Sequence, residues 1–125
     1  MPRVGRREEQ AHALFHAPVV TVSHGTQDDP ILNYGSQLAL TLWEMTWEQL
    51  VQTASRLTAE PMNRAEREEM LERARVQGYI DNYRGVRISS SGRRFLIEQA
   101  VVWTVIDNVG HPQGQAATFS RWTFL

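Results

Sequence analysis

The spacing of apolar residues along the chain changes near residue 78. Before it, the short β-rich runs VVTVSH and ILNY flank the polar turn GTQDDP, which predicts an antiparallel hairpin. Apolar residues then recur at helical spacing between residues 36 and 77, whereas beyond Tyr79 they alternate with period two in three longer runs. The pattern therefore predicts two strands, a group of helices and three further antiparallel strands.

Three helical pieces are predicted between the two β regions. The first follows Asn33 or Ser36, either of which can cap it by accepting a hydrogen bond from a free backbone N–H. The second runs through WEQLVQTA and begins with Thr46 and Gln49 at the spacing of a capping box. The third begins after a proline at residue 61 and is stopped by a glycine at residue 78. We expect all three to lie on one face of the sheet.

Residues 1–17 are predicted to be a charged tail followed by a short helix that begins near Glu8. Ala11, Leu14 and Phe15 form its apolar stripe, at i, i+3 and i+4. Residues 18–125 then form a single domain. We see no internal repeat, low-complexity tract or linker within it.

The middle strand of the C-terminal region is apolar on both faces. Strict alternation predicts one face made of Phe95, Ile97, Val101, Trp103 and Val105, and an opposite face made of Leu96, Ala100, Val102 and Ile106. Helices can cover only one of these faces. We therefore expect a homodimer, with the N-terminal helix beside or within the interface on the other face.

Composition and charge narrow the functional classes. The chain has 125 residues, 42% hydrophobic and 22% charged, which suits one soluble domain with one core. Its 13 basic and 14 acidic residues argue against a nucleic-acid binder, and no run approaches the roughly 20 apolar residues that span a bilayer. With no cysteine and no signal-peptide pattern, a cytoplasmic location is expected.

The predicted order of elements resembles the PAS fold, a class of α+β domain built on a five-stranded antiparallel sheet. ILNYGSQLALTLW is similar to its crossover, in which a strand ends at an asparagine and a helix follows. TWEQL is similar to the start of its second helix, while SSSGRRF and DNVGHPQG are similar to the two glycine hairpins of its sheet. The resemblance implies short helices on one face and the N-terminal helix as an addition.

A closer resemblance is to the MEKHLA domain family, PAS-like domains that occur alone in bacteria and at the C-terminus of plant homeodomain leucine-zipper regulators. It is carried by ILNYGSQLALTLWE, SRLTAEP, GVRISSSGRRF and GQAATF. The chain is identified as a member of the stand-alone bacterial type. This resemblance implies a sensory or regulatory role, and no reaction or ligand comes with it.

The sequence offers few residues that could hold a metal ion or a cofactor. His12 and His16 stand at i, i+4, the spacing of a two-histidine metal site, but no third ligand is near, because His24 and His111 are predicted to lie in distant turns. We expect no metal site and no catalytic residue. The chain has no cysteine to form the flavin adduct of a light-sensing PAS domain, and its third helix has no histidine to ligate haem. The cofactor, if any, stays unidentified.

Polar residues on otherwise apolar elements are the candidates for ligand binding. Glu98 and Gln99 are adjacent in the middle strand, so one of them is expected to face the helices. The candidate set is Arg56, Glu60, Arg87, Glu98, Gln99, Gln115 and Trp43. One interpretation is an internal ion-pair and hydrogen-bond network that holds the helices on the sheet. The other is a cavity in which these groups orient a small polar ligand.

Three functional hypotheses follow. A non-catalytic small-molecule sensor predicts a cavity, and an interaction module predicts a filled core with a large apolar outer face. The third hypothesis is an enzyme with a cone-shaped α+β barrel, in which a curved sheet holds a pocket with one carboxylate acting as a base. That fold generally places its long helices before the sheet, whereas here a hairpin precedes them. We favour the sensor, a cytoplasmic homodimer without nucleic-acid or membrane partners.

Overall fold

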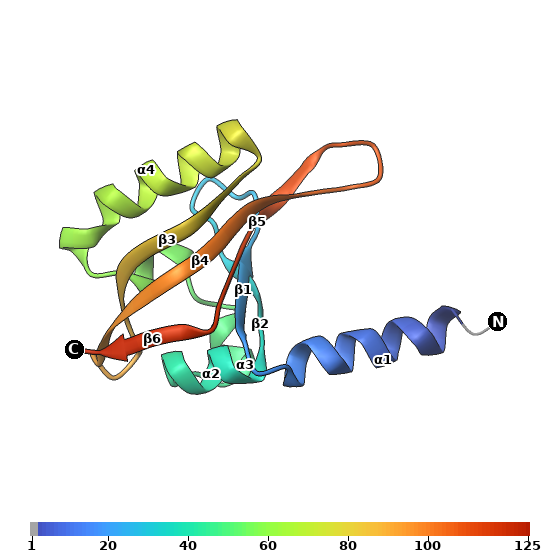
Figure 1. Cartoon of the computed structure of the whole chain (residues 1–125), viewed down its shortest axis with the longest axis horizontal. Helices are drawn as coiled ribbons and strands as arrows, with labels where there is room; N and C mark the ends of the chain where they lie inside the picture. The colour runs from blue at the N-terminus through green and yellow to red at the C-terminus, as the bar shows by residue number, and fades with distance from the viewer. Residues whose placement is uncertain (1–2) are drawn as a thin grey trace.

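The computed structural model describes the backbone of residues 3–125 and the side chains from Glu9 onward. One antiparallel sheet curves around the helices, and its strands lie in the order β2-β1-β5-β4-β3, with β6 paired to β4 (Figure 1). This is the α+β class and the strand arrangement that the sequence predicts. The elements are α1 (Arg3–His16), β1 (Val20–His24), β2 (Leu32–Gly35), α2 (Gln37–Trp43), α3 (Trp47–Leu50), the 3-10 helix η1 (Ser55–Thr58), α4 (Pro61–Gln77), β3 (Tyr79–Ile88), β4 (Arg94–Ile106), β5 (Pro112–Phe119) and β6 (Arg121–Phe124).

The described part of the sheet has six strands rather than five, because the last predicted strand is broken at Ser120. The two pieces, β5 and β6, lie along the same strand, β4. From Val101 onward β4 pairs with β5, whereas its first half, from Phe95 to Glu98, pairs with β6. The break therefore coincides with a change of partner in the middle of β4.

Two β-bulges set which side chains face the helices. Between Tyr83 and Gly85, β3 advances two residues while β4 passes from Ala100 to Ile97, so β4 has one extra residue there. Gln99 has a positive φ of 55° at this point. A second bulge lies in β3, where Asn82 has a φ of 53°.

The bulge in β4 overturns the predicted alternation. Phe95 and Ile97 face the helices, but beyond the bulge it is Ala100 and Val102 that are buried. Trp103 therefore lies on the opposite face from Phe95, because one inserted residue moves every later side chain to the other side of the sheet. The predicted grouping of Val101, Trp103 and Val105 with Phe95 was wrong.

The helices begin largely where the sequence indicates. The Ser36 hydroxyl accepts a hydrogen bond from the Ala39 backbone N–H and caps α2, and Thr46 and Gln49 form both bonds of the capping box of α3. The second helix is shorter than predicted, since the chain continues into the unpredicted η1. Gly78, with a φ of 90°, ends α4.

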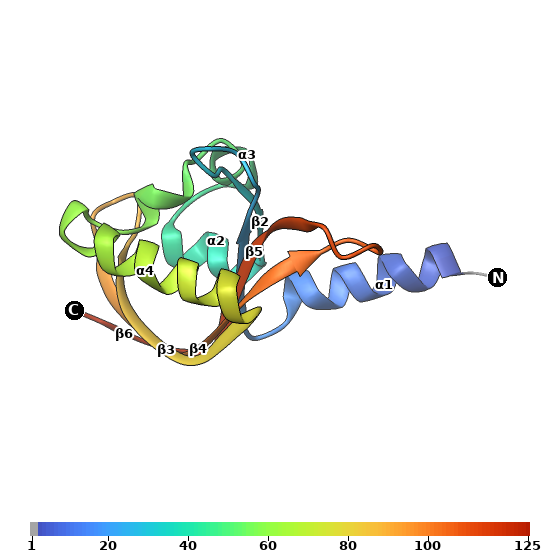
Figure 2. The same cartoon turned by 90° about the horizontal axis from the view of Figure 1, so that it is seen from above.

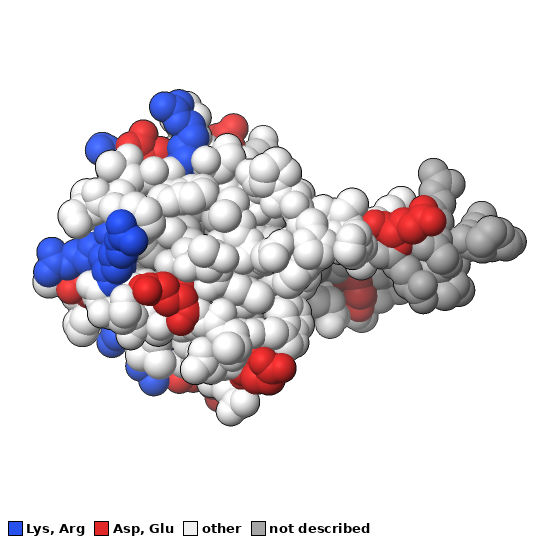
Figure 3. Space-filling model, turned by 90° about the horizontal axis from the view of Figure 1, so that it is seen from below, with Lys and Arg blue, Asp and Glu red and all other residues white. Residues whose placement is uncertain are grey.

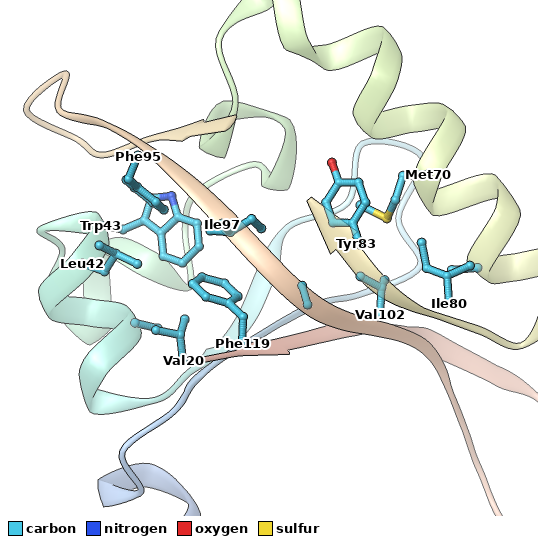
Figure 4. Close-up of a cluster of buried hydrophobic side chains, with 13 residues drawn as sticks. Val20, Leu42, Trp43, Met70, Ile80, Tyr83, Phe95, Ile97, Val102 and Phe119 are labelled. Atoms are coloured by element: carbon cyan, nitrogen blue, oxygen red, sulfur yellow. The ribbon is translucent and has the colours of Figure 1, made fainter. Parts of the chain in front are cut away.

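The core lies between the helices and the concave face of the sheet (Figure 2). In the close-up its side chains form two groups (Figure 4). Trp43 and Leu42 of α2 lie with Phe95, Phe119 and Val20, whereas a second group lies under α4 and contains Met70, Ile80, Tyr83 and Val102. The edge-to-face rings of Trp43 and Phe95, with centroids 5.2 Å apart, anchor the first group.

Helix α1 projects from the body and does not cover the outer face of the sheet (Figures 1 and 2). It begins at Arg3, five residues before the predicted start, and is attached near its end, where Phe15 lies edge-to-face on Trp47 and His16 bonds to Gln37. Leu14 remains 46% exposed. The outer face thus has no cover within the described part of the chain.

Candidate functional site

A cavity of about 60 Å³ lies in the core, between the two groups of apolar side chains. Its walls include Trp43, Ile97 and Phe119 of the first group's side and Met70, Tyr83 and Val102 of the second. By volume it holds roughly four to six water-sized groups. The polar residues that line it are Ser23, His24, Ser55, Thr58, Arg67, Tyr83, Arg87 and Gln115.

Helix α4 brings Arg67 into this cavity. Arg67 stands three residues before Met70 and seven before Ala74, so the three share one face, and that face packs on the sheet. Its side chain is only 5% exposed. The guanidinium donates from Nη2 to the Ser55 hydroxyl and from Nη1 to Glu68, 3.2 Å away.

Strand β3 brings Tyr83 and Arg87, which meet above Gly85. Arg87 Nη2 donates to the Tyr83 hydroxyl at 3.0 Å, and Nη1 donates to its neighbour's backbone oxygen, Val86 O, at 2.8 Å. A side chain at Gly85 would collide with the Tyr83 hydroxyl and come within 3.0 Å of Arg87 Nη1. Glycine at this position therefore makes room for the guanidinium. Arg87 as a whole is only 5% exposed.

The two buried arginines lack a carboxylate among the residues that line the cavity. Arg67 reaches Glu68, whose side chain is 67% exposed, and Arg87 has no ion pair with any carboxylate of the described side chains. The Tyr83 hydroxyl links Arg87 indirectly to the exposed Glu66, donating to it at 2.7 Å. Burial, and then the positive charge of Arg87, lower the pKa of Arg67 to about 10. The cavity therefore carries positive charge that is compensated only from the surface.

His24 completes the polar wall. It is the last residue of β1 and is buried, not part of a turn as predicted. His24 Nδ1 is hydrogen-bonded to the Ser55 hydroxyl, 2.8 Å away, and the same hydroxyl accepts from Arg67. Burial, and then the charge of Arg67, lower the pKa of His24 to about 4.

Acid is expected to weaken the fold through His24. Its pKa is about 4 when folded and 6.5 in the reference state, so the unfolded chain binds more protons between these values. The contribution is complete above pH 6.5 and is lost as the pH falls toward 4. Chemical denaturation should show roughly 2 kcal/mol of stability lost between about pH 7 and pH 5, a window above the carboxylate titrations.

The matched variants for this measurement are His24→Gln and the exposed His12→Gln. The first should flatten the pH dependence in that window, and the second should leave it as in the natural chain. An unchanged slope in His24→Gln would show that another group carries the effect.

The structure brings together three of the seven predicted site residues. Arg87, Gln115 and Trp43 line the cavity. Gln115 donates to Leu71 O at 2.8 Å and ties β5 to α4, while the buried Trp43 Nε1 has no hydrogen-bond partner among the described residues.

The other four predicted residues lie elsewhere. Arg56 pairs at the surface with Asp29, 3.2 Å away, and Glu60 pairs with Arg94 at 2.9 Å. Glu98 and Gln99 both lie away from the helices. The bulge inserts one residue between the inward-facing Ile97 and Ala100, so two successive residues lie on the outer side. The expectation that one of these two faces the helices was wrong.

Six residues of the polar wall were missed by sequence reasoning: Ser23, His24, Ser55, Thr58, Arg67 and Tyr83. Arg67 carried a usable signal, since it is a charged residue on the apolar stripe of α4. Ser55 and His24 carried none, because they are 31 residues apart and meet only through the tertiary fold. Within the described side chains no three histidine, aspartate, glutamate or cysteine residues are grouped to hold a metal.

These features define a PAS fold, and solved structures agree. A PAS domain of a protein from Colwellia psychrerythraea aligns with a TM-score of 0.78 at 14% identity, over 96% of this chain and 97% of that one. The structure described as "Flavin Analogue Sheds Light on Light-Oxygen-Voltage Domain Mechanism" aligns with a TM-score of 0.71 at 16% identity, over 94% and 84%. An RNA-binding Light-Oxygen-Voltage receptor aligns with a TM-score of 0.78 at 14% identity, over 94% of this chain but 33% of that one.

The chain belongs to the MEKHLA domain family, whose pattern matches residues 1–124. The family resemblance seen in the sequence is thereby confirmed, and with it the PAS-like fold. The search of curated proteins returned no significant match. None of the described helices is both long and apolar enough to cross a membrane.

A flavin does not fit this cavity. Its volume of about 60 Å³ is well below the roughly 300–1,000 Å³ of sites for larger organic ligands. The chain also has no cysteine to form a flavin adduct. We therefore assign no role to a flavin in this cavity.

Proposed function

We propose that the chain is a non-catalytic PAS-like sensory domain whose core cavity binds a small ligand. The observation that carries this proposal is the convergence of polar side chains from β1, η1, α4, β3 and β5 on one cavity with mostly apolar walls. A network serving stability alone would pair its charges with each other. Here the buried arginines find no such partner in the cavity wall, which supports a ligand site over a filled core.

His24 and Ser55 do not make the cavity a catalytic site. A histidine next to a serine hydroxyl is the arrangement of a general base and a nucleophile. However, a pKa of about 4 makes His24 a poor base near neutral pH, and the Ser55 oxygen already accepts from Arg67. The pair supports a polar wall that orients a ligand.

Filling the cavity is expected to abolish ligand binding without unfolding the protein. Ala117 lines the cavity, so Ala117→Met places a longer apolar side chain in it, at a cost of about 1–3 kcal/mol. Ala65, which is exposed on α4, provides the control Ala65→Met. Native mass spectrometry of freshly purified protein should show a bound small molecule in the natural chain and in the control but not in Ala117→Met.

Two results would contradict the proposal. The natural chain would carry no small molecule and bind none from a metabolite-sized library, or Ala117→Met would retain the bound mass. The first result would favour the interaction module with a filled core.

We also propose that the protein forms a homodimer through the outer face of its sheet. Between strands β3 and β4 this face presents Tyr79, Val86, Ile88, Leu96, Val101, Trp103 and Val105. Tyr79 is 58% exposed, and α1 leaves the face open. Figure 3 shows a neighbouring side of the molecule, seen from below, where an area without charged side chains reaches the base of α1. In a two-fold symmetric dimer the same apolar surface lies on both sides of the contact, so each copy covers the outer face of the other.

A further inference from the structure

We propose that the ligand of the cavity is a short-chain carboxylate, with its carboxylate between Arg67 and Arg87 and its aliphatic part against the apolar walls. This inference rests on the proposed ligand-binding function and names the chemistry of the same site. Three observations carry it: two buried cations on one cavity, the absence of an acidic residue in its wall, and its small, mostly apolar volume.

The two guanidiniums have donors to spare. Each carries five N–H donors. Hydrogen bonds to the protein use one donor at Nη1 and one at Nη2 in both Arg67 and Arg87. The planar fork of a guanidinium matches the two oxygens of a carboxylate, which makes bidentate pairing the favoured use of the remaining donors.

Electrostatics point to an anion rather than to a neutral polar molecule. Arg67 and Arg87 are each 5% exposed and approach closely enough for the charge of one to affect the other. The carboxylate nearest to Arg67, that of Glu68, is 67% exposed on its solvent side, so water and salt screen it. An anion inside the cavity would act on both cations in a less polar environment, where the attraction is stronger.

Size and wall chemistry favour a short carboxylate over an inorganic oxyanion. The space of about 60 Å³ suits roughly four to six non-hydrogen atoms, the size of acetate to butyrate. Leu32, Met70, Ile97 and Phe119 give the wall apolar surface away from the arginines. Phosphate carries polar oxygens in all directions and would leave some of them against these side chains without partners.

Thermal unfolding with sodium acetate, propionate and butyrate tests the inference. The reference is sodium chloride at equal ionic strength, and propionamide and phosphate serve as the neutral and the inorganic comparison. We expect the best carboxylate, at about 100 times its Kd, to raise the Tm on the order of 10 °C above chloride, with no shift from propionamide. Isothermal titration calorimetry on the natural chain measures the same binding directly.

Arg67→Met and Arg87→Met should lose the carboxylate-specific shift, whereas Arg56→Met should keep it, because Arg56 pairs with Asp29 at the surface. Near-UV circular dichroism establishes that each variant is folded. If a variant fails to fold, titration of the natural chain with propionate against propionamide still decides the question.

The outcomes separate this inference from the proposed function. Equal binding of propionamide and propionate, or a shift with phosphate and not with carboxylates, would overturn the carboxylate assignment while leaving the cavity as a ligand site. Retention of the shift in both cavity variants would also overturn it. A chain that binds no probe and carries no co-purified molecule would remove the proposed function as well.

Discussion

Replacing Gly114 with alanine is expected to lower the free energy of unfolding by at least about 3 kcal/mol. Gly114 lies in β5 with a φ of 138°, a backbone conformation that side chains rarely adopt. A methyl group there would also overlap the backbone oxygen of His24 and come within 3.0 Å of its carbonyl carbon. Backbone cannot rotate aside as a side chain can, so the end of β1 would have to move.

Gly92→Ala is the matched control. Gly92 also has a positive φ, 90°, but nothing lies within 4 Å of the position its side chain would take. This variant should lose only the conformational term, about 1–2 kcal/mol. Urea unfolding of both proteins measures the difference. Equal losses would show that the end of β1 can shift at no cost.

Trp103→Glu is expected to convert the proposed homodimer to a monomer, raising its Kd more than about 100-fold, or roughly 2.8 kcal/mol. Trp103 lies near the middle of the outer face, paired with Tyr79 on one side and Ala116 on the other. A carboxylate at this point would be buried without a partner in the dimer but hydrated in the monomer. Its expected effect on the fold of one chain is small, since Trp103 is only partly buried there.

Val76→Glu provides the control for this experiment. Val76 is 70% exposed on α4, away from the sheet, so the same kind of substitution should leave the stoichiometry unchanged. Analytical ultracentrifugation over a range of concentrations measures both variants and the chain without residues 1–17, whose dimer should be weaker. A natural chain that stays monomeric at high micromolar concentration would contradict the dimer.

The order of the elements could be predicted from the sequence because it depends on short-range physics. Side-chain periodicity separates the helical region from the strands, and the caps at Ser36 and Thr46 need only the backbone N–H groups a few residues ahead. The glycine stop at Gly78 is equally local. Together these features set the order of elements that resembles the PAS fold, whereas the resemblance to the MEKHLA family rests on particular stretches such as GVRISSSGRRF and GQAATF.

The identity of the cavity residues was decided by the tertiary structure. Along β3 the bulge at Asn82 turns Tyr83 and Arg87 inward, and along β4 the bulge at Gln99 keeps Glu98 outside. A strand's side chains repeat every two residues, so one extra residue reverses all that follow. Whether a strand bulges depends on its fit to neighbours distant in sequence. The sequence by itself therefore determined the succession of helices and strands, and only the pairing of β3, β4 and β5 decided which polar groups meet in the core.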